Sequence, residues 1–234
     1  MVTKIDRIAS KAAAKMHKHN KPIATKLTVI LRNIVKDLRK MGIKCKLQGL
    51  KYKLKTVSSL QDKYSRIMER ENIGITKAIK KVKDGVRFSV VFDKEQYVMG
   101  VLKLWDKLSE YGYESITRPT KSEIRWIIGD GYQGINMIIA QKGREGVPIE
   151  IQFHTKESIK EKEKMHPLYE KLRKECDEKL SLEQFKALDP QSKCVLYKEQ
   201  LIKAEKKIPI PKKLKKCKTL KKANNRIKDL EYCL

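Results

Sequence analysis

Apolar side chains recur at helical spacing through the first third of the chain. An Ala- and Lys-rich stretch at 3–19 predicts one helix, and the apolar stripe within 23–41 predicts a second. Pro22 suits the first turn of that second helix, because proline has no N–H to donate, so we expect a break near Asn20. The same periodicity predicts helices at 60–71 (with Ser58 or Ser59 as its cap), 76–82, 93–110, 157–179 and 182–207.

The strongest strand signal is the unbroken run VRFSVVF at 86–92. Further strands are predicted at 43–56, 113–118, 125–128, 136–141 and 148–154, with the turn GREG joining the last two. Strands and helices in this order predict an α+β (α/β-like) fold, in which helices cover a mixed central sheet of about five strands. A basic helical segment, 1–42, and a helical, lysine-rich segment, 178–234, would be additions to this core.

The net charge of +27 is unevenly distributed. Residues 1–82 hold 22 Lys and Arg against 5 Asp and Glu, residues 206–234 hold 11 against 2, and the middle is almost neutral. Basic flanks of this kind attract nucleotides or nucleic acid. The alternative is a solvated, lysine-rich surface that binds nothing.

The cysteine pattern gives no sign of a cross-link. Cys45, Cys176, Cys194, Cys217 and Cys233 form no CxxC pair and no metal-ligand spacing with the four histidines. We therefore expect a reducing compartment, without a disulfide framework or a zinc site.

No apolar window approaches eighteen residues, and the N-terminus lacks the apolar core of a signal peptide. These observations predict a cytoplasmic protein without a membrane span, although export without a cleavable signal stays open.

Four polar patches carry the candidate chemistry. The first, KLKTVSSLQDKYSR at 53–66, places cations and a hydroxyl on a loop and on the helix that follows, an arrangement that suits a polyphosphate. The second, DGVRFS, sets Asp84 and Arg87 at the head of the best strand. The third, GYQGIN at 131–136, combines glycines with an aromatic ring that can stack on a base. The bland alternatives are a solvated basic helix for the first patch and a Gly-rich turn for the third.

The fourth patch, EIQFHT, follows strand alternation. Glu150, Gln152 and His154 share one face, and the apolar residues between them share the other. Asp84 and Glu150 from two strands would together hold Mg²⁺ against ATP phosphates, or one of them would take a proton from a hydroxyl. The alternative is an edge strand with one solvated face.

In this order the patches resemble the synthetase domain of RelA/SpoT-type enzymes. That family carries Arg/Lys-x-Lys-x-x-x-Ser-Ile-x-x-Lys-x-x-Arg, Asp…Gly-x-Arg, Gly-Tyr-x-Ser-x-His and Glu-x-Gln-Ile-Arg-Thr. The resemblance covers 43–177 and implies a nucleotidyltransferase-like catalytic domain. Such a domain would move pyrophosphate from ATP to a ribose 3′-hydroxyl of a guanine or adenine nucleotide, or of tRNA.

The resemblance also implies roles for single residues. ATP would be bound by Lys53, Lys55, Ser59, Lys63, Arg66 and Arg87. Asp84 and Glu150 would be the catalytic and Mg²⁺-binding carboxylates, with Glu150 as ligand or general base. The acceptor side would be lined by Tyr132, Asn136, Gln152 and His154, with Tyr132 stacked on the acceptor base.

Departures from the family pattern point to a subgroup. Val82 stands where the family has its Asp, and Asp84 lies two positions later on the same strand face; Asn136 replaces a His and His154 an Arg. With HPLYEKLR at 166–173, these variants resemble the divergent toxin-like branch, some members of which modify the 3′ end of tRNA. The chain lacks a His-Asp hydrolase motif and is compatible with an oligomer. The alternative function is a catalytically inactive, basic protein of the same fold that binds or packages nucleic acid.

Overall fold

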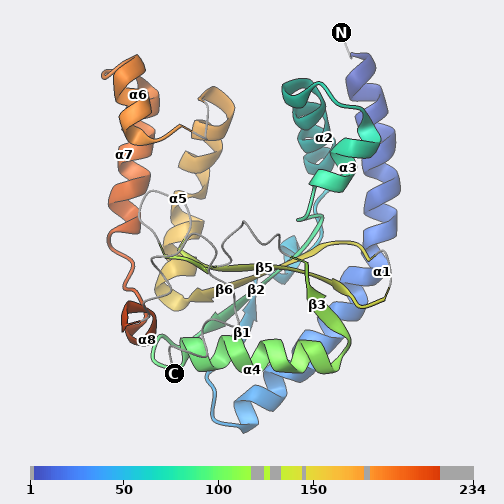
Figure 1. The fold of residues 1–234 in the computed structure, drawn as a ribbon, viewed down its shortest axis with the longest axis vertical. Coiled ribbons are helices and arrows are strands. Elements are labelled where there is room, and N and C mark those ends of the chain that lie inside the picture. Colours follow the sequence, from blue (N-terminus) through green and yellow to red (C-terminus); the bar gives the residue numbers. More distant parts are fainter. Residues whose placement is uncertain (1–2, 117–123, 127–132, 144–145, 177–179, 217–234) are drawn as a thin grey trace. The chain divides into compact units, whose positions relative to one another are not determined.

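The computed structural model describes the whole chain except residues 1–2, 117–123, 127–132, 144–145, 177–179 and 217–234 (Figure 1). The helices are α1 (Lys4–Lys40), α2 (Val57–Glu71), α3 (Ile75–Lys81), α4 (Tyr97–Glu110), α5 (Lys156–Glu175), α6 (Leu182–Leu188), α7 (Lys193–Glu205) and α8 (Lys212–Lys216), with a 3₁₀ turn η1 (Leu50–Tyr52). The strands are β1 (Cys45–Gln48), β2 (Val86–Phe92), β3 (Tyr113–Ser115), β4 (Ile124–Arg125), β5 (Gly134–Gln141) and β6 (Ile149–Thr155).

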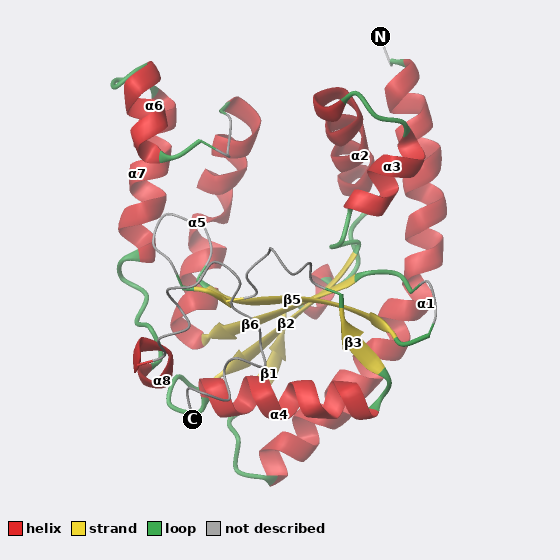
Figure 2. Cartoon of the chain, in the orientation of Figure 1, coloured by secondary structure: helices red, strands yellow, loops and turns green. Residues whose placement is uncertain are grey.

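One mixed sheet holds all six described strands (Figure 2). The order is β1-β2-β6-β5-β3, and β4 pairs with β5. β3 runs antiparallel to β5, with Tyr113 opposite Gln141. The prediction of an α+β fold with a mixed central sheet is confirmed. β2 and β6 are neighbours in the interior of the sheet, so β6 is buried along its whole length although its residues alternate between apolar and polar.

The chain divides into two compact units. The first comprises Met1–Val90, Leu102–Arg118 and Asn136–Gln152; the second comprises Val91–Val101, Pro119–Ile135 and Phe153–Leu234. The division of the sequence into 1–42, 43–177 and 178–234 stays a prediction.

In the first unit, α1 is one helix of 37 residues, so the prediction of two helices separated near Asn20 is wrong. Thr3 opens α1 with a capping box, and Pro22 lies inside the helix. The buried stripe continues past Pro22 on both sides, through Ala13, Ala24 and Leu27. Packing of this stripe therefore overrides the local break, since one missing hydrogen bond costs less than exposing a helix face.

α1 and α2 pack closely because α1 contributes small alanine side chains to the contact. Ala9 and Ala13 of α1 are fully buried in a cluster with Leu60 and Tyr64 of α2. α2 begins one turn earlier than the sequence predicts, because Thr56 accepts the hydrogen bond from the Ser59 N–H and is the N-cap in place of Ser58 or Ser59.

Only the first part of the predicted strand 43–56 forms β1. Gly49 takes a left-handed conformation (φ +67°) that turns the chain into η1. After this turn, Leu54 forms a single antiparallel bridge with Val86 of β2. The chain therefore pairs with the sheet twice over this stretch, and the segment around residues 53–55 lies beside the start of β2.

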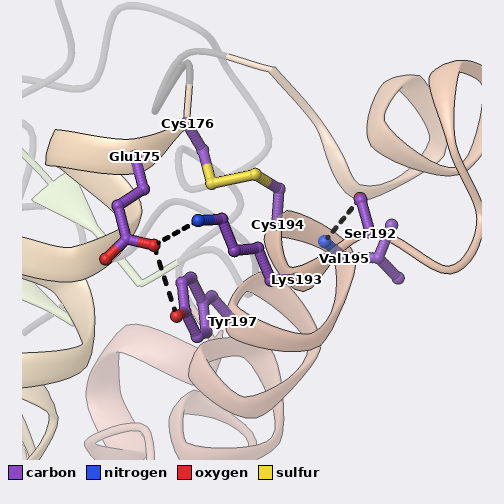
Figure 3. The surroundings of a disulfide bond; sticks show 7 residues. All are labelled: Glu175, Cys176, Ser192, Lys193, Cys194, Val195 and Tyr197. Carbon is purple, nitrogen blue, oxygen red and sulfur yellow. Dashed lines mark hydrogen bonds and ion pairs between the residues drawn. A yellow bond between two sulfur atoms is a disulfide. The ribbon is translucent and has the colours of Figure 1, made fainter.

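In the second unit, helices α5, α6 and α7 pack around Leu172, Phe185, Val195 and Leu201. A disulfide joins Cys176 to Cys194, and Glu175 pairs with Lys193 beside it (Figure 3). The expectation that the chain has no disulfide is therefore wrong. Cys176 follows α5 directly and Cys194 lies in the first turn of α7, so their proximity comes from the packing of α7 on α5 and leaves no trace in cysteine spacing.

None of the helices in the described parts of the chain has the length and apolar character that a membrane crossing requires.

The position of Pro22 generates a prediction about stability. Pro22→Ala restores an N–H donor and removes a ring clash in the interior of α1, so it should raise the free energy of unfolding by about 1–3 kcal/mol. Urea unfolding followed by circular dichroism measures this directly. The neighbouring exposed residue Lys21 supplies the control, because Lys21→Ala leaves the backbone hydrogen bonds unchanged. An unchanged or lowered stability of Pro22→Ala would contradict a regular helix at this point.

Candidate functional site

The backbone of the cationic segment is tied to β2 within the first unit. The Arg87 N–H donates to the Lys53 carbonyl (2.8 Å), and the Lys55 N–H donates to the Gly85 carbonyl (3.1 Å). His17 of α1 donates through Nδ1 to the Lys55 carbonyl at 2.8 Å. Gly85 lies close to α1, because a Cβ at this position would lie 2.7 Å from the Asn20 side-chain nitrogen and the Asn20 side chain would have to shift. These contacts hold the first and second predicted patches side by side.

Asp84 is the electrostatic centre of this arrangement. Lys63 donates through Nζ to its Oδ1 at 2.6 Å, and the Lys55 Nζ lies 3.3 Å from its Oδ2. Burial alone would raise the pKa of the Asp84 carboxyl, but the charges of Lys63 and Lys55, with a smaller effect of Arg87, hold that pKa at about 2. Burial also lowers the pKa of the Lys55 ammonium, and Asp84 opposes that effect.

Glu150 has a different environment. It lies on the interior strand β6 and is only 7% exposed, which excludes the alternative of a solvated edge strand. Asn136 of β5 donates through Nδ2 to Glu150 Oε1 at 2.7 Å, and Arg87 Nε lies 3.8 Å from Oε2. Oε2 is buried and accepts no hydrogen bond from the described residues. Glu150 is thus a buried carboxylate whose Oε1 is oriented by a hydrogen bond. Its Oε2 faces the Arg87 cation and accepts no hydrogen bond from the described residues.

Arg87 links the two carboxylates. It pairs with Glu150 through the side chain, and its charge contributes to the lowered pKa of Asp84. Strand alternation on β2 places Ser89 on the same face as Arg87, and the Ser89 hydroxyl donates to Gln152 Oε1 at 3.4 Å. Ser89 is not among the predicted site residues, although its position two residues after Arg87 on a predicted strand is a sufficient signal.

The remaining ATP-side residues lie on or before α2. Lys53 and Arg66 are half-buried, whereas Ser59 is exposed near the helix N-terminus and accepts a hydrogen bond from the Thr56 hydroxyl (3.0 Å). α2 therefore presents Ser59, Lys63 and Arg66 from one element, as the first patch predicts.

The other two predicted acceptor-side residues are Tyr132 and His154. Tyr132 lies outside the described residues. His154 belongs to the second unit and is completely buried, with Nδ1 3.1 Å from the Ser158 hydroxyl in the capping box of α5.

The carboxylates fit the donor chemistry of Mg²⁺ better than that of zinc. No group of three or more His, Cys, Asp or Glu side chains is placed to hold a metal among the described residues. Mg²⁺, however, is commonly held by one or two carboxylates together with substrate phosphates. The buried Oε2 of Glu150, with no hydrogen-bond donor from the described chain, is an oxygen of the type this ion prefers.

Comparisons with known proteins identify the fold. No protein-family model matches the sequence, and no curated protein matches it either. The small alarmone synthetase 1 from Bacillus subtilis, in a structure bound to its product pppGpp, has a TM-score of 0.56 and 15% identity, over 84% of this chain and 90% of its own. A GTP pyrophosphokinase family protein from Streptococcus pneumoniae has a TM-score of 0.54 and 17% identity, over 82% and 86%.

These likenesses show the fold of the chain. It shares this fold with a GTP pyrophosphokinase family protein and with small alarmone synthetases. The fold implied by the sequence motifs is thereby confirmed.

The pKa of Asp84 predicts an acid-dependent loss of stability. A folded pKa of about 2 lies below the ordinary 3.8, so the ion pairs stabilise the protein above about pH 4, and this stabilisation is lost as the pH falls toward 2. The difference corresponds to about 2 kcal/mol in total. Asp84→Asn should therefore cost at least about 2 kcal/mol at pH 6, and about 1 kcal/mol less at pH 3.

Urea unfolding of wild type and Asp84→Asn between pH 3 and pH 6 measures how the difference in their free energies of unfolding shrinks as the pH falls. Asp62→Asn is the matched control, because Asp62 is exposed on the same helix as Lys63 and forms no ion pair within the described chain. Parallel stability curves for wild type and Asp84→Asn would contradict the assigned ion pairs.

The contact between Asn136 and Glu150 predicts how a second carboxyl group at position 136 would change the stability of the protein. Asn136→Asp would set two carboxyl groups close together in a buried place, which raises the pKa of the pair. A raised folded pKa destabilises the ionised form, so the variant should lose about 1–3 kcal/mol at pH 7 and recover part of this loss near pH 4.5. Thermal unfolding at both pH values measures the recovery. Asn136→Ala removes the same hydrogen bond without adding charge, and an equal pH response of both variants would argue against the contact.

Proposed function

We propose that the protein is a pyrophosphokinase that transfers pyrophosphate from ATP to a ribose 3′-hydroxyl of a nucleotide or of tRNA. The observation that carries the proposal is Glu150, a buried carboxylate oriented by Asn136 and Arg87, with one oxygen that accepts no hydrogen bond from the described residues. The fold shared with small alarmone synthetases supports it.

The cations around Asp84 suit the β- and γ-phosphates of ATP. Lys55 and Lys63 pair with Asp84, Arg87 acts on it through its charge, and Lys53 and Arg66 lie on the same loop and helix, so five cations belong to the segments that meet at this one carboxylate. Lys55 and Lys63 would exchange the Asp84 oxygens for phosphate oxygens when ATP binds, because both are charged donors on flexible stems. Their present pairing with Asp84 keeps the two ammonium groups in place without substrate.

Catalysis in this proposal is positioning followed by one proton transfer. The ribose hydroxyl oxygen attacks the β-phosphorus, the bond between the α,β-bridging oxygen and that phosphorus breaks, and AMP leaves. Glu150 takes the hydroxyl proton on Oε2, while Asn136 keeps Oε1 fixed. Mg²⁺, when bound, would be held by Asp84 and would neutralise charge on the phosphates; Glu150 would be its second ligand only in the alternative in which Glu150 does not take the proton.

The acceptor side of the proposal rests on fewer contacts. Gln152 of β6 is held by Ser89 and is the residue we place nearest the acceptor. Asn136 acts through its hydrogen bond to Glu150, so we propose it as a positioning residue. Tyr132 is retained as the stacking residue, and His154 as a residue that shapes the end of β6. A toxin-like role with tRNA as acceptor is the version that the basic flanks favour.

A second function is favoured by one observation. Both oxygens of Asp84 are engaged by lysine ammonium groups, which is how a former metal ligand would be neutralised in an inactive protein. A catalytically inactive protein of this fold that binds nucleic acid through its charge is therefore the alternative.

Glu150→Gln distinguishes the two. Glutamine keeps the size of the side chain and an acceptor for Asn136 but takes no proton, so turnover of ATP to AMP should fall at least about 100-fold. The measurement uses ATP labelled at the γ-phosphate with a panel of GDP, GTP, ADP and bulk tRNA; pyrophosphate transfer carries the label onto the acceptor.

Glu114→Gln is the control, since Glu114 is an exposed glutamate on β3 of the same sheet. Full activity of Glu150→Gln would reject the site, and label recovered as free pyrophosphate would indicate nucleotide transfer instead. Absence of turnover by the wild-type protein with every acceptor, together with salt-sensitive nucleic-acid binding, would support the inactive alternative.

A further inference from the structure

A basic pocket lies in the first unit and shares no residue with the candidate site. It has a volume of about 570 Å³ and is formed by the last turns of α1 together with β1 and η1. The lining residues are Arg32, Val35, Lys36, Arg39, Lys40, Lys46, Leu47 and Leu50. Five of these eight residues are cationic and none is acidic, so the pocket concentrates positive charge without an internal counter-charge.

The positive charge is not neutralised by neighbouring acids. No ion pair within the described residues involves the five cations of the pocket. Of the two acids of α1, Asp6 accepts from the Ser65 hydroxyl, and Asp37 forms no ion pair with these five cations among the described residues. Arg39 donates through Nε to the Cys45 carbonyl at 2.8 Å, which fixes its guanidinium against β1.

The pocket is one end of a longer cationic surface. Arg32, Lys36 and Lys40 recur at helical spacing, and exposed cations continue along α1 toward its N-terminus at Lys18, Lys15, Lys11, Arg7 and Lys4. α1 runs as one helix over this whole stretch (Figure 1). A helix of 37 residues is about 55 Å long, which far exceeds the length of a single nucleotide.

We propose that this pocket and the exposed cationic face of α1 bind the phosphate backbone of a polynucleotide. The pocket lining contains no aromatic ring, so it offers phosphate contacts without a stacking surface for a base. The surface therefore recognises charge spaced along a strand, independent of base sequence. This binding does not depend on pyrophosphate transfer, and Glu150→Gln protein should bind like the wild type.

The test is fluorescence anisotropy with a fluorescein-labelled RNA of about 20 nucleotides and mixed sequence, titrated at several NaCl concentrations. The triple variant R32Q/K36Q/K40Q should weaken binding at least about tenfold at 0.1 M salt and reduce the slope of log K against log salt by about 2, since each single-strand phosphate contact contributes about 0.7. Arg39 is left intact because it also holds β1.

A triple variant K160Q/K171Q/K174Q is the matched control. It removes the same charge from exposed positions on α5, outside the two basic flanks, and should change binding less than about twofold. Circular dichroism confirms that both triples are folded. The proposal is supported if only the α1 triple loses RNA binding and salt slope.

Three results would overturn it. Equal losses in both triples would mean that overall charge, not this surface, binds RNA. Unchanged RNA binding in R32Q/K36Q/K40Q would exclude the surface. Loss of ATP or GTP binding in that variant, with RNA binding intact, would assign the pocket to a mononucleotide.

Discussion

The ion pairs of Asp84 with Lys55 and Lys63 join three stretches of chain that are distant in sequence. They connect the start of β2 with the segment around residues 53–55 and with α2. Because Asp84 and Lys55 are both largely buried, neither charge can be left without its partner at a small energetic cost. The charges of Asp84, Lys55 and Lys63 are therefore balanced only when all three of these segments are in their observed positions. The close approach of Gly85 to Asn20 and the bond from His17 to the Lys55 carbonyl bring α1 into the same constraint.

The two carboxylates of the site are balanced in different ways, and the difference divides their roles. Asp84 has both oxygens engaged by ammonium groups, so its negative charge mainly keeps cations in place. Glu150 has one oxygen fixed by Asn136 and another that receives no hydrogen bond from the described chain. A saturated carboxylate is suited to organising a site, whereas an unsaturated, buried one is suited to accepting a proton or a cation. Arg87, which affects both, keeps them in one electrostatic unit.

Much of this arrangement follows from the sequence. The run at 86–92 is β2, and alternation on β6 does place Glu150 and Gln152 together, because both features rest on local periodicity. The cationic patch does lie beside Asp84, as the order of the motifs implied, although this contact joins segments that are distant in sequence. What could not be predicted depends on packing between distant segments. The continuity of α1 through Pro22 follows from the buried stripe that continues on both sides of it. The Cys176–Cys194 disulfide depends on α7 packing against α5, and the burial of His154 depends on Ser158 at the start of the next helix.

The continuity of α1 also gives the charge of the N-terminal region a physical form. With a helix broken near Asn20, its cations would be divided between two elements with independent directions. In one helix, Ala and Leu residues face the core while Lys and Arg residues recur along the solvated side. Like charges held in register repel one another, and this repulsion is relieved when an extended anion lies along the helix. The same packing that overrides the proline therefore aligns the cationic surface that ends in the basic pocket.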